Sequence, residues 1–446
     1  MVILPSLSLP TDELRRITGV RNYEERMLFL LLTLREPGVR VIYLSTEPVD
    51  PEIVEYYLGF LDDPESARSR LHMVDLGGGR DVEPLTRAVL ERPDVIARLR
   101  ELTGPDAWLV PFVVSEDEQR LSQALSIPIY GPPLHLAGLG SKTGARVAGE
   151  AAGVPMARGF ADLWSLPEVE QAARALAPAN RLMVKLNDGY SGLGNALVST
   201  LAGVPLTESP TSFSSAEETW ASFAEKISQR GAVVEEFIEE RPLHSPSALA
   251  RITPGGRWDI VATHDQVLGG PNSDVYLGCT FPARDEYRAV VTQSAAAISR
   301  VLAERGVIGL FGMDFFATRS GDGYRALLCE INLRIGGTTH PFGAALLTTG
   351  GSYDAATGTL VAEGRRKYYT ATDNCSSSWL RGRTPGDVVR LLDALGLGFD
   401  RTRRTGNVLH LMGAIPRYGK VGFTSIGDSR EEASELHEAT VKALSG

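Results

Sequence analysis

The sequence has few of the features that mark secreted or membrane proteins. Its three cysteines, Cys279, Cys329 and Cys375, are too few and too scattered for a disulfide framework or a cysteine-based zinc site. No apolar run reaches the roughly 18 residues that a transmembrane helix needs. Residues 1–10 also lack the basic start of a signal peptide. We therefore expect reduced thiols and a cytoplasmic protein that does not act at a membrane.

Basic residues are in the minority, and lysine is scarce among them. The net charge is −10, which argues against a nucleic-acid partner because such proteins usually carry a basic stripe. Only six of the 45 basic residues are lysines, so arginine is the default cation. A lysine that persists under this bias could mark a place where a compact ammonium group is needed. Lys142 and Lys185 are such candidates, whereas Lys226 and Lys442 lie on polar helical stretches and are attributed to chance.

The 446 residues suffice for two to four structural units. Residues 1–130 alternate helical and buried-strand patterns, which predicts a small α/β unit around a parallel sheet. We predict a second unit over 131–230 and a strand-rich third unit over 231–340. A tail over 341–446 contains two further strands, at 367–372 and 408–415, and a closing helix at 429–444. Residues 133–152 are predicted to form one helix, and residues 187–195 and 205–215 to form mobile loops.

The first chemical motif is a lysine followed by a glycine-rich loop. Lys185 ends a buried strand, and Gly189, Ser191, Gly192 and Gly194 follow it within nine residues. Glycines let backbone N–H groups approach phosphate oxygens, while the lysine supplies positive charge. The motif is not a Walker A sequence because no Gly-Lys-Ser/Thr follows. A glycine-rich hairpin with a surface lysine is the alternative.

The second motif is a buried strand that runs into Glu235, Glu236, Phe237 and Ile238. Adenine needs an acceptor for its amine, a backbone N–H for its ring nitrogen and an apolar cover. One glutamate and the backbone of the two apolar residues could supply all three. The alternative, a solvated strand end, is favoured when the motif is taken alone.

The third motif combines two carboxylates, an amide and an arginine on neighbouring strands. Glu330, Asn332 and Arg334 are spaced by two and should share one face of a strand. Asp314, on the strand before it, could join them across an antiparallel pair. Oxygen ligands of this kind suit Mg²⁺, and Arg334 could contact a phosphoryl group. A polar face exposed to water is the alternative, which the apolar flanking residues weaken.

The order and spacing of the three motifs resemble the ATP-grasp superfamily over residues 142–334. The resemblance implies an ATP-grasp fold of mixed α/β and α+β class. It would have an N-terminal parallel-sheet pre-ATP-grasp domain, two α+β subdomains and a C-terminal α+β extension. It also implies ATP and Mg²⁺, with two ions expected, as cofactors of a carboxylate–amine ligase that forms ADP.

The same resemblance assigns roles to single residues. Lys142 and Lys185 would bind the nucleotide phosphates, Gly189 to Gly194 would form a lid, and Glu235 to Ile238 would form the adenine hinge. Asp314, Glu330 and Asn332 would be the metal ligands. Arg334, Lys185 and Glu330 would act in catalysis. The sequence departs from the family after the hinge, where no glutamate for the ribose can be assigned in residues 241–247.

Within that superfamily, the chain resembles the peptide ligases of pheganomycin-type antibiotic biosynthesis more closely. The resemblance lies in residues 189–195, 330–341 and 422–428. That resemblance implies a small-molecule carboxylic acid, a guanidino-bearing amino acid, joined to the N-terminal amine of a peptide. A homodimer is left open. Two alternatives remain: a small-molecule kinase that uses the same nucleotide site, and a non-catalytic ATP-binding regulator.

Other polar residues are weaker candidates for contacts with substrate. Arg257, His264 and Asp265 lie on or beside one strand, and His264 is expected to be structural. His340 could line the acyl site or belong to a plain turn. Tyr368, Tyr369 and Asp373 could shape a peptide-binding surface or pack as ordinary strand residues.

Overall fold

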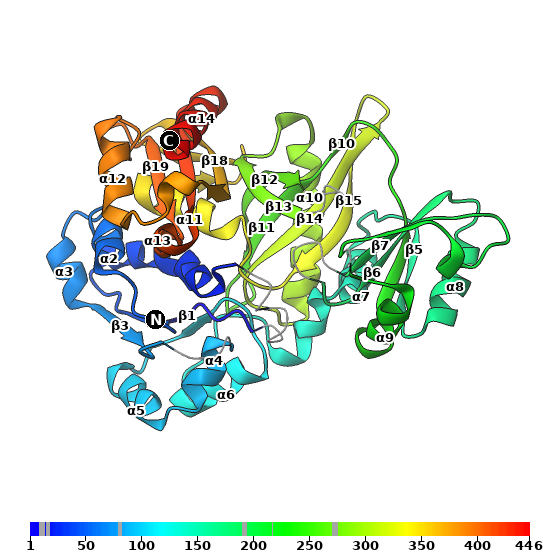
Figure 1. Ribbon diagram of the computed structural model, residues 1–446, viewed down its shortest axis with the longest axis horizontal. Helices are drawn as coiled ribbons and strands as arrows, with labels where there is room; N and C mark the ends of the chain where they lie inside the picture. Colours follow the sequence, from blue (N-terminus) through cyan, green and yellow to red (C-terminus); the bar gives the residue numbers. More distant parts are fainter. Residues whose placement is uncertain (9–13, 15–17, 79–82, 190–193, 216, 270–274) are drawn as a thin grey trace.

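The computed structural model describes residues 1–8, 14, 18–78, 83–189, 194–215, 217–269 and 275–446. The described residues form three sheets. In Figure 1 the long central sheet lies between the N-terminal sheet on one side and a small sheet on the other. Within the described residues, no helix combines the length and apolarity that crossing a bilayer would demand.

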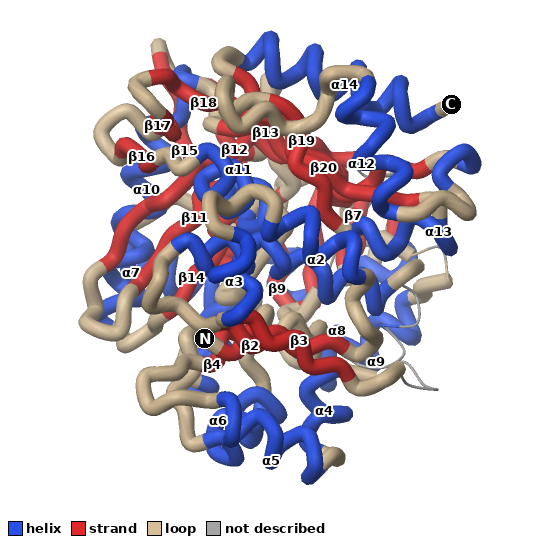
Figure 2. Tube along the Cα trace, turned by 90° about the vertical axis from the view of Figure 1, so that its left-hand side faces the viewer, coloured by secondary structure: helices blue, strands red, loops and turns tan. Residues whose placement is uncertain are grey.

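The N-terminal sheet is parallel, as the alternating pattern predicted. Its order is β3-β2-β1-β4, and its strands are β1 (Val2–Leu4), β2 (Val41–Ser45), β3 (Leu71–Asp75) and β4 (Leu109–Pro111). In Figure 2, α4 (Leu85–Leu90), α5 (Pro93–Leu102) and α6 (Glu116–Leu125) lie below this sheet, and α2 (Pro51–Leu58) and α3 (Pro64–Ser69) lie on its other side. Successive side chains of one strand face opposite layers, so Leu44 packs with one cluster and Tyr43 with another. Both faces of this sheet are therefore buried, as parallel sheets require.

The small sheet is antiparallel and has the order β5-β9-β6-β7-β8. Its elements are β5 (Gly159–Leu163), α8 (Leu166–Ala175), β6 (Arg181–Leu186), β7 (Asn195–Ser199), η3 (Leu206–Glu208), β8 (Thr211–Phe213), α9 (Trp220–Arg230) and β9 (Ala232–Glu236). The prediction of a loop over 205–215 was wrong, because β8 pairs with β7 and Phe213 packs against Trp220. β9 lies between β5 and β6 in this sheet. It therefore belongs to the small sheet, although the third unit was predicted to begin at residue 231.

The central sheet has 11 strands and continues from the third unit into the tail. Its elements are β10 (Leu243–His244), β11 (Pro246–Ile252), β12 (Trp258–Gly269), β13 (Val275–Phe281), α10 (Asp285–Glu304), β14 (Gly309–Ser320), β15 (Gly323–Asn332), α11 (Thr339–Thr349), β16 (Ser352–Asp354), β17 (Thr359–Ala362), β18 (Arg365–Ser376), β19 (Gly406–His410) and β20 (Lys420–Gly427). β13 pairs with β18, so the tail strands extend the sheet. The predicted boundary at residue 340 falls inside α11.

The remaining elements of the tail are short helices and the closing helix. They are η4 (Ser378–Leu380), α12 (Pro385–Ala394), η5 (Met412–Ala414), α13 (Ile415–Tyr418) and α14 (Arg430–Ser445). The strand predicted over 408–415 ends at His410, because Leu411 takes a left-handed conformation (φ 55°) and helical turns follow.

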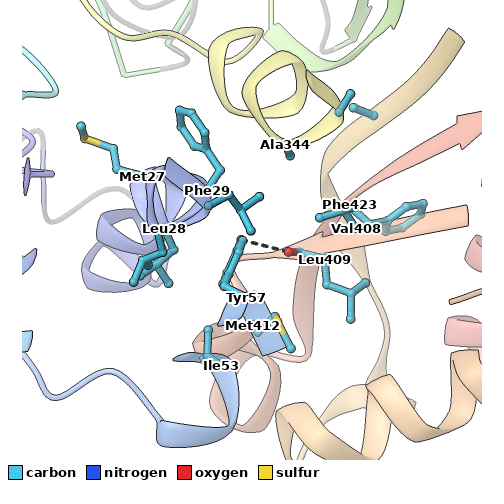
Figure 3. Packing of buried hydrophobic residues seen from close by; sticks show 14 of the residues in the cluster. Met27, Leu28, Phe29, Ile53, Tyr57, Ala344, Val408, Leu409, Met412 and Phe423 are labelled. Carbon is cyan, nitrogen blue, oxygen red and sulfur yellow. Dashed lines mark hydrogen bonds between the residues drawn. The ribbon is translucent and has the colours of Figure 1, made fainter. Parts of the chain in front are cut away.

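The first and last parts of the chain share one core. Helix η1 (Val20–Arg35) packs against α11, and Figure 3 shows its Phe29 near Ala344 and α2 near β19. The hydroxyl of Tyr57 donates a hydrogen bond of 3.0 Å to the carbonyl oxygen of Leu409. The N-terminal unit is thus fixed to the tail, and Figure 1 shows the small sheet on the opposite side of the central sheet.

Gly343 of α11 lies against Phe29 of η1, and this contact gives a stability prediction. A Cβ at this position would lie 2.2 Å from Cε2 of Phe29. Alanine normally strengthens a helix by up to about 1 kcal/mol, but overpacking costs about 1–3 kcal/mol. We expect Gly343→Ala to lower the free energy of unfolding, measured by urea denaturation. Gly104→Ala is the control, because no atom lies within 4 Å of its Cβ position; a stabilised Gly343→Ala would contradict this packing.

Candidate active site

Lys142 is the first residue of a helix that begins in the middle of the segment predicted to form one continuous helix. The chain forms η2 (Leu134–Gly140) and then α7 (Lys142–Ala152), with Ser141 between them. The Ser141 hydroxyl donates to the carbonyl of Gly138 and accepts from the backbone N–H of Gly144 at 3.0 Å. A serine that caps a helix in this way ends one segment and starts the next. The prediction of one helix over 133–152 was therefore wrong.

Asn187 fastens the start of α7 to the end of β6. The backbone N–H of Lys142 donates to the backbone carbonyl of Asn187 at 3.2 Å, and the Thr143 N–H and hydroxyl donate to its side-chain oxygen at 3.0 and 2.7 Å. Lys185 lies two residues before Asn187 on β6. The two lysines that the composition singled out are thereby brought to one place.

Lys185 belongs to a buried ion network around Glu235. Its ammonium group contacts Oε2 of Glu235 at 2.7 Å, and the Arg146 guanidinium contacts Oε1 at 2.8 Å. Burial alone would raise the pKa of Glu235, but the two cations hold it below its usual range. Burial alone would also lower the pKa of Lys185, whereas Cys329 and Glu235 raise it. Both groups therefore stay charged, and the Glu235 carboxylate is engaged with cations.

β9 ends at Glu236, and the side chains from Glu236 onward are less buried than Glu235. The Glu236 carboxylate pairs with Arg158 and is half-exposed. The Phe237 ring lies under the Arg181 guanidinium, 4.2 Å from its centre. Ile238 follows directly, so an arginine-covered aromatic and an apolar residue adjoin the buried network.

Asp314 and Glu330 meet across the β14–β15 pair, where their Cα atoms are direct partners. The Asn332 amide donates to one carboxylate oxygen of each residue at 3.0 Å. Lys142 forms an ion pair with the other oxygen of Glu330. The expected juxtaposition of the two strands is thus present, and it includes the first lysine.

Burial shifts the protonation of these groups. It lowers the pKa of Lys142 to about 8, aided by the positive charge of Lys185. It raises the pKa of Asp314 to about 6, although Lys142 and Arg334 oppose that shift. A buried, partly compensated cluster of this kind is typical of a functional site.

Cys329 and Gln266 complete the site, and the sequence pattern missed both. The β14–β15 register shifts between Asp314 and Phe315, which leaves Cys329 as the extra residue of a bulge. Its sulfur lies 3.7 Å from the Lys185 ammonium group. Gln266 lies on β12, and its amide donates a hydrogen bond of 3.1 Å to Asp314. Strict alternation points Cys329 away from Glu330, so no pattern in the sequence could place it here.

Arg334 lies two residues beyond the end of β15 and borders an apolar cavity of about 110 Å³. The cavity is lined by Phe29, Leu30, residues 110–114, residues 130–132, Leu310 and residues 333–335. Its walls come from the N-terminal unit and the central sheet. Two members of the glycine-rich motif, Gly189 and Gly194, are described, and the backbone N–H of Leu186 donates to the carbonyl of Gly194 at 2.8 Å. Ser191 and Gly192 lie outside the described residues.

The weaker candidates for substrate contacts are mostly engaged elsewhere. His264 is fully buried and lies 2.6 Å from the Tyr369 hydroxyl, so it is structural, as expected. Asp265 accepts hydrogen bonds from Tyr287 and from the backbone of Arg284 at the start of α10. Tyr369 and Asp373 are buried, which is inconsistent with an exposed peptide-binding surface.

A curated relative covers nearly the whole chain. L-Propargylglycine–L-glutamate ligase from Streptantibioticus cattleyicolor is 32% identical over 97% of this chain and 91% of that protein. The chain belongs to the ATP-grasp superfamily of carboxylate–amine ligases. Residues 199–342 also match the "IQCH-like, ATP-grasp" family, and residues 387–440 match the "PGM1 C-terminal domain". A more distant relative, IQ motif-containing protein H from Danio rerio, is 22% identical over 75% of this chain and 37% of that protein.

Solved structures show the same ATP-grasp fold. N5-carboxyaminoimidazole ribonucleotide synthetase from Thermus thermophilus superposes with a TM-score of 0.57, at 16% identity, over 100% of this chain and 99% of that one. Biotin carboxylase from Campylobacter jejuni, solved as a beta-gamma-ATP complex, gives a TM-score of 0.60 at 14% identity, over 94% and 89%. The predicted fold class is confirmed.

Proposed function

We propose that this ATP-grasp ligase activates an amino-acid carboxylate as an acyl phosphate and couples it to an amine, converting ATP to ADP. The observation that carries the proposal is the convergence of Lys142 and Lys185 with Asp314, Glu330 and Asn332. Two phosphate-binding cations beside two carboxylates match the needs of phosphoryl transfer, where charge must be positioned and neutralised.

The nucleotide would lie between the small sheet and the central sheet. Lys142 and Lys185 would hold its phosphates, with Glu235 and Arg146 keeping Lys185 in place. The chain from Glu236 to Ile238 would face the adenine, and Gly189 to Gly194, including Ser191 and Gly192, would cover the phosphates. Glu235 thus supports Lys185 and the hinge through the same buried contacts.

Asp314, Glu330 and Asn332 fit Mg²⁺ by the chemistry of their donors. Mg²⁺ prefers carboxylate and amide oxygens together with phosphate oxygens, and these three side chains already contact one another. Two ions are proposed, and Asp314, Glu330 and Asn332 would hold them. Bound Mg²⁺ would neutralise the charge on the transferring phosphoryl group.

The reaction needs no nucleophile from the protein. A carboxylate oxygen of the substrate attacks the γ-phosphorus, the bond to the bridging oxygen breaks, and ADP leaves. The amine then attacks the acyl carbon, phosphate leaves, and the amine loses a proton. Arg334, at the border of the cavity, would hold the carboxylate and the phosphoryl group during both steps.

Two pairs of substrates fit this reaction. The resemblance to pheganomycin-type ligases favours a guanidino-bearing acid and the N-terminal amine of a peptide in antibiotic biosynthesis. The apolar cavity beside Arg334 and the relative that acts on propargylglycine and glutamate favour a small apolar amino acid and a single amino acid as acceptor. An apolar lining offers no partner for a guanidinium group, whose burial without one is costly.

A substrate screen distinguishes the pairs and tests the function. Candidate acids of both kinds are mixed with amino acids or short peptides, ATP and Mg²⁺, and products are read by mass spectrometry together with ADP. We expect one amide and one ADP per turnover. Formation of AMP and pyrophosphate would contradict the mechanism, and a stable phosphorylated acid in the presence of every amine would favour a kinase.

A further inference from the structure

His340, Asp373 and His410 form a buried cluster away from the nucleotide site. They come from the start of α11, from β18 and from the end of β19, which lie together in the tail (Figure 1); β20 lies between the two strands and pairs with both. Their exposed fractions are 2%, 3% and 5%. The ligase reaction uses none of them.

The three side chains point their coordinating atoms at one spot. Nε2 of His340 and Nε2 of His410 lie 2.9 and 2.8 Å from the same oxygen of Asp373, Oδ1. The two nitrogens are 3.1 Å apart. All three atoms therefore form a nearly equilateral triangle.

Hydrogen bonds explain this triangle poorly. If both rings donate to Oδ1, two donor nitrogens face each other at 3.1 Å with no acceptor between them. One cation satisfies all three atoms. In an octahedral site, bonds of about 2.1 Å at right angles would separate neighbouring ligand atoms by about 3.0 Å, close to the distances in the cluster.

The surroundings of the cluster also suit a metal site. Arg26 of η1 binds Oδ2, the other oxygen of Asp373, and so fixes the carboxylate from behind. Gly422 of β20 leaves the space in which the His410 ring lies, because a Cβ there would be 2.2 Å from Nε2. The rings are thus held in place by neighbouring backbone and by a buried ion pair.

We propose that His340, Asp373 and His410 bind one first-row divalent transition-metal ion in an octahedral site, for which Zn²⁺ serves as the probe. Two imidazoles and one carboxylate are nitrogen-rich ligands that favour such ions over Mg²⁺. The ion joins α11, which follows the Arg334 segment, to β18 and β19. It is a structural ion that holds the tail, and the proposal is independent of the proposed substrates.

The test uses the full-length protein stripped with a chelator, reloaded with Zn²⁺ in excess Mg²⁺ without nucleotide, and freed of weakly bound metal. We expect one zinc per chain by elemental analysis, and none in Asp373→Asn or His410→Asn. His264→Asn is the matched control, because it removes another buried histidine of the same sheet, and it should keep the metal. Zinc-free wild type, or zinc retained by both cluster variants, would overturn the proposal.

X-ray absorption at the zinc edge of the wild-type protein provides a reading that does not depend on the folding of variants. Two imidazole ligands with oxygen, and no sulfur, are expected. A shell that contains sulfur, or one made of oxygen alone, would place the ion elsewhere and refute the assignment.

Discussion

Glu330→Gln should reduce the rate of ADP formation by about 10²- to 10³-fold, the loss typical when one charge-stabilising group is removed from a reaction site. Glu330 pairs directly with Asp314 across the sheet and contacts both Asn332 and Lys142. The substitution removes the charge of a proposed metal ligand but keeps the shape of the side chain. The measurement is kcat for coupled ADP release with saturating substrates.

Glu304→Gln provides the control for that experiment. Glu304 ends α10 at the surface, and its ion-pair partner among the described residues is the exposed Arg300 at 3.4 Å. The kcat of Glu304→Gln should therefore equal that of the wild type. The unfolding midpoints of both variants should match the wild type, which separates chemistry from folding. Full activity of Glu330→Gln would show that Glu330 is not a metal ligand, and it would contradict the core of the proposed mechanism.

Glu235→Ala should lower the free energy of unfolding by about 3–5 kcal/mol, the usual cost of breaking a buried ion pair from one side. Lys185 and Arg146 would each lose their carboxylate partner, and all three side chains are about nine-tenths buried. The charges left behind have no access to water that could replace the lost partner. Urea denaturation measures the change.

The neighbouring Glu236 gives a matched comparison on the same strand. Its carboxylate also pairs with an arginine, but Arg158 is 56% exposed. An exposed ion pair contributes only about 0–1 kcal/mol, so Glu236→Ala should be nearly neutral. If both variants lost the same free energy of unfolding, burial would not determine how strongly this ion network stabilises the protein.

The sequence predicted those parts of the site that follow simple strand geometry. Asp314 and Glu330 could be paired because alternation holds along β14 and β15 up to that point. Lys142 and Lys185 were identified by rarity, since lysine is uncommon in an arginine-rich chain. Both arguments use local properties of the sequence.

The remaining parts depend on tertiary contacts that no local pattern encodes. Cys329 reaches Lys185 only because a bulge breaks the alternation, and Arg146 reaches Glu235 from a helix 89 residues away. His340, Asp373 and His410 are separated by more than 30 residues each, and only the folding of the tail onto α11 brings them together. The end of η2 at Ser141 likewise depends on a cap that the helical pattern conceals.

The central claim is that the carboxylate becomes an acyl phosphate, and isotope transfer tests it most directly. The acid identified by the screen is labelled with ¹⁸O in its carboxylate and turned over with ATP, Mg²⁺ and the amine. Attack of the carboxylate on the γ-phosphorus predicts one ¹⁸O in the released inorganic phosphate for each amide formed. Label in AMP, or phosphate without label while the amide accumulates, would contradict the account.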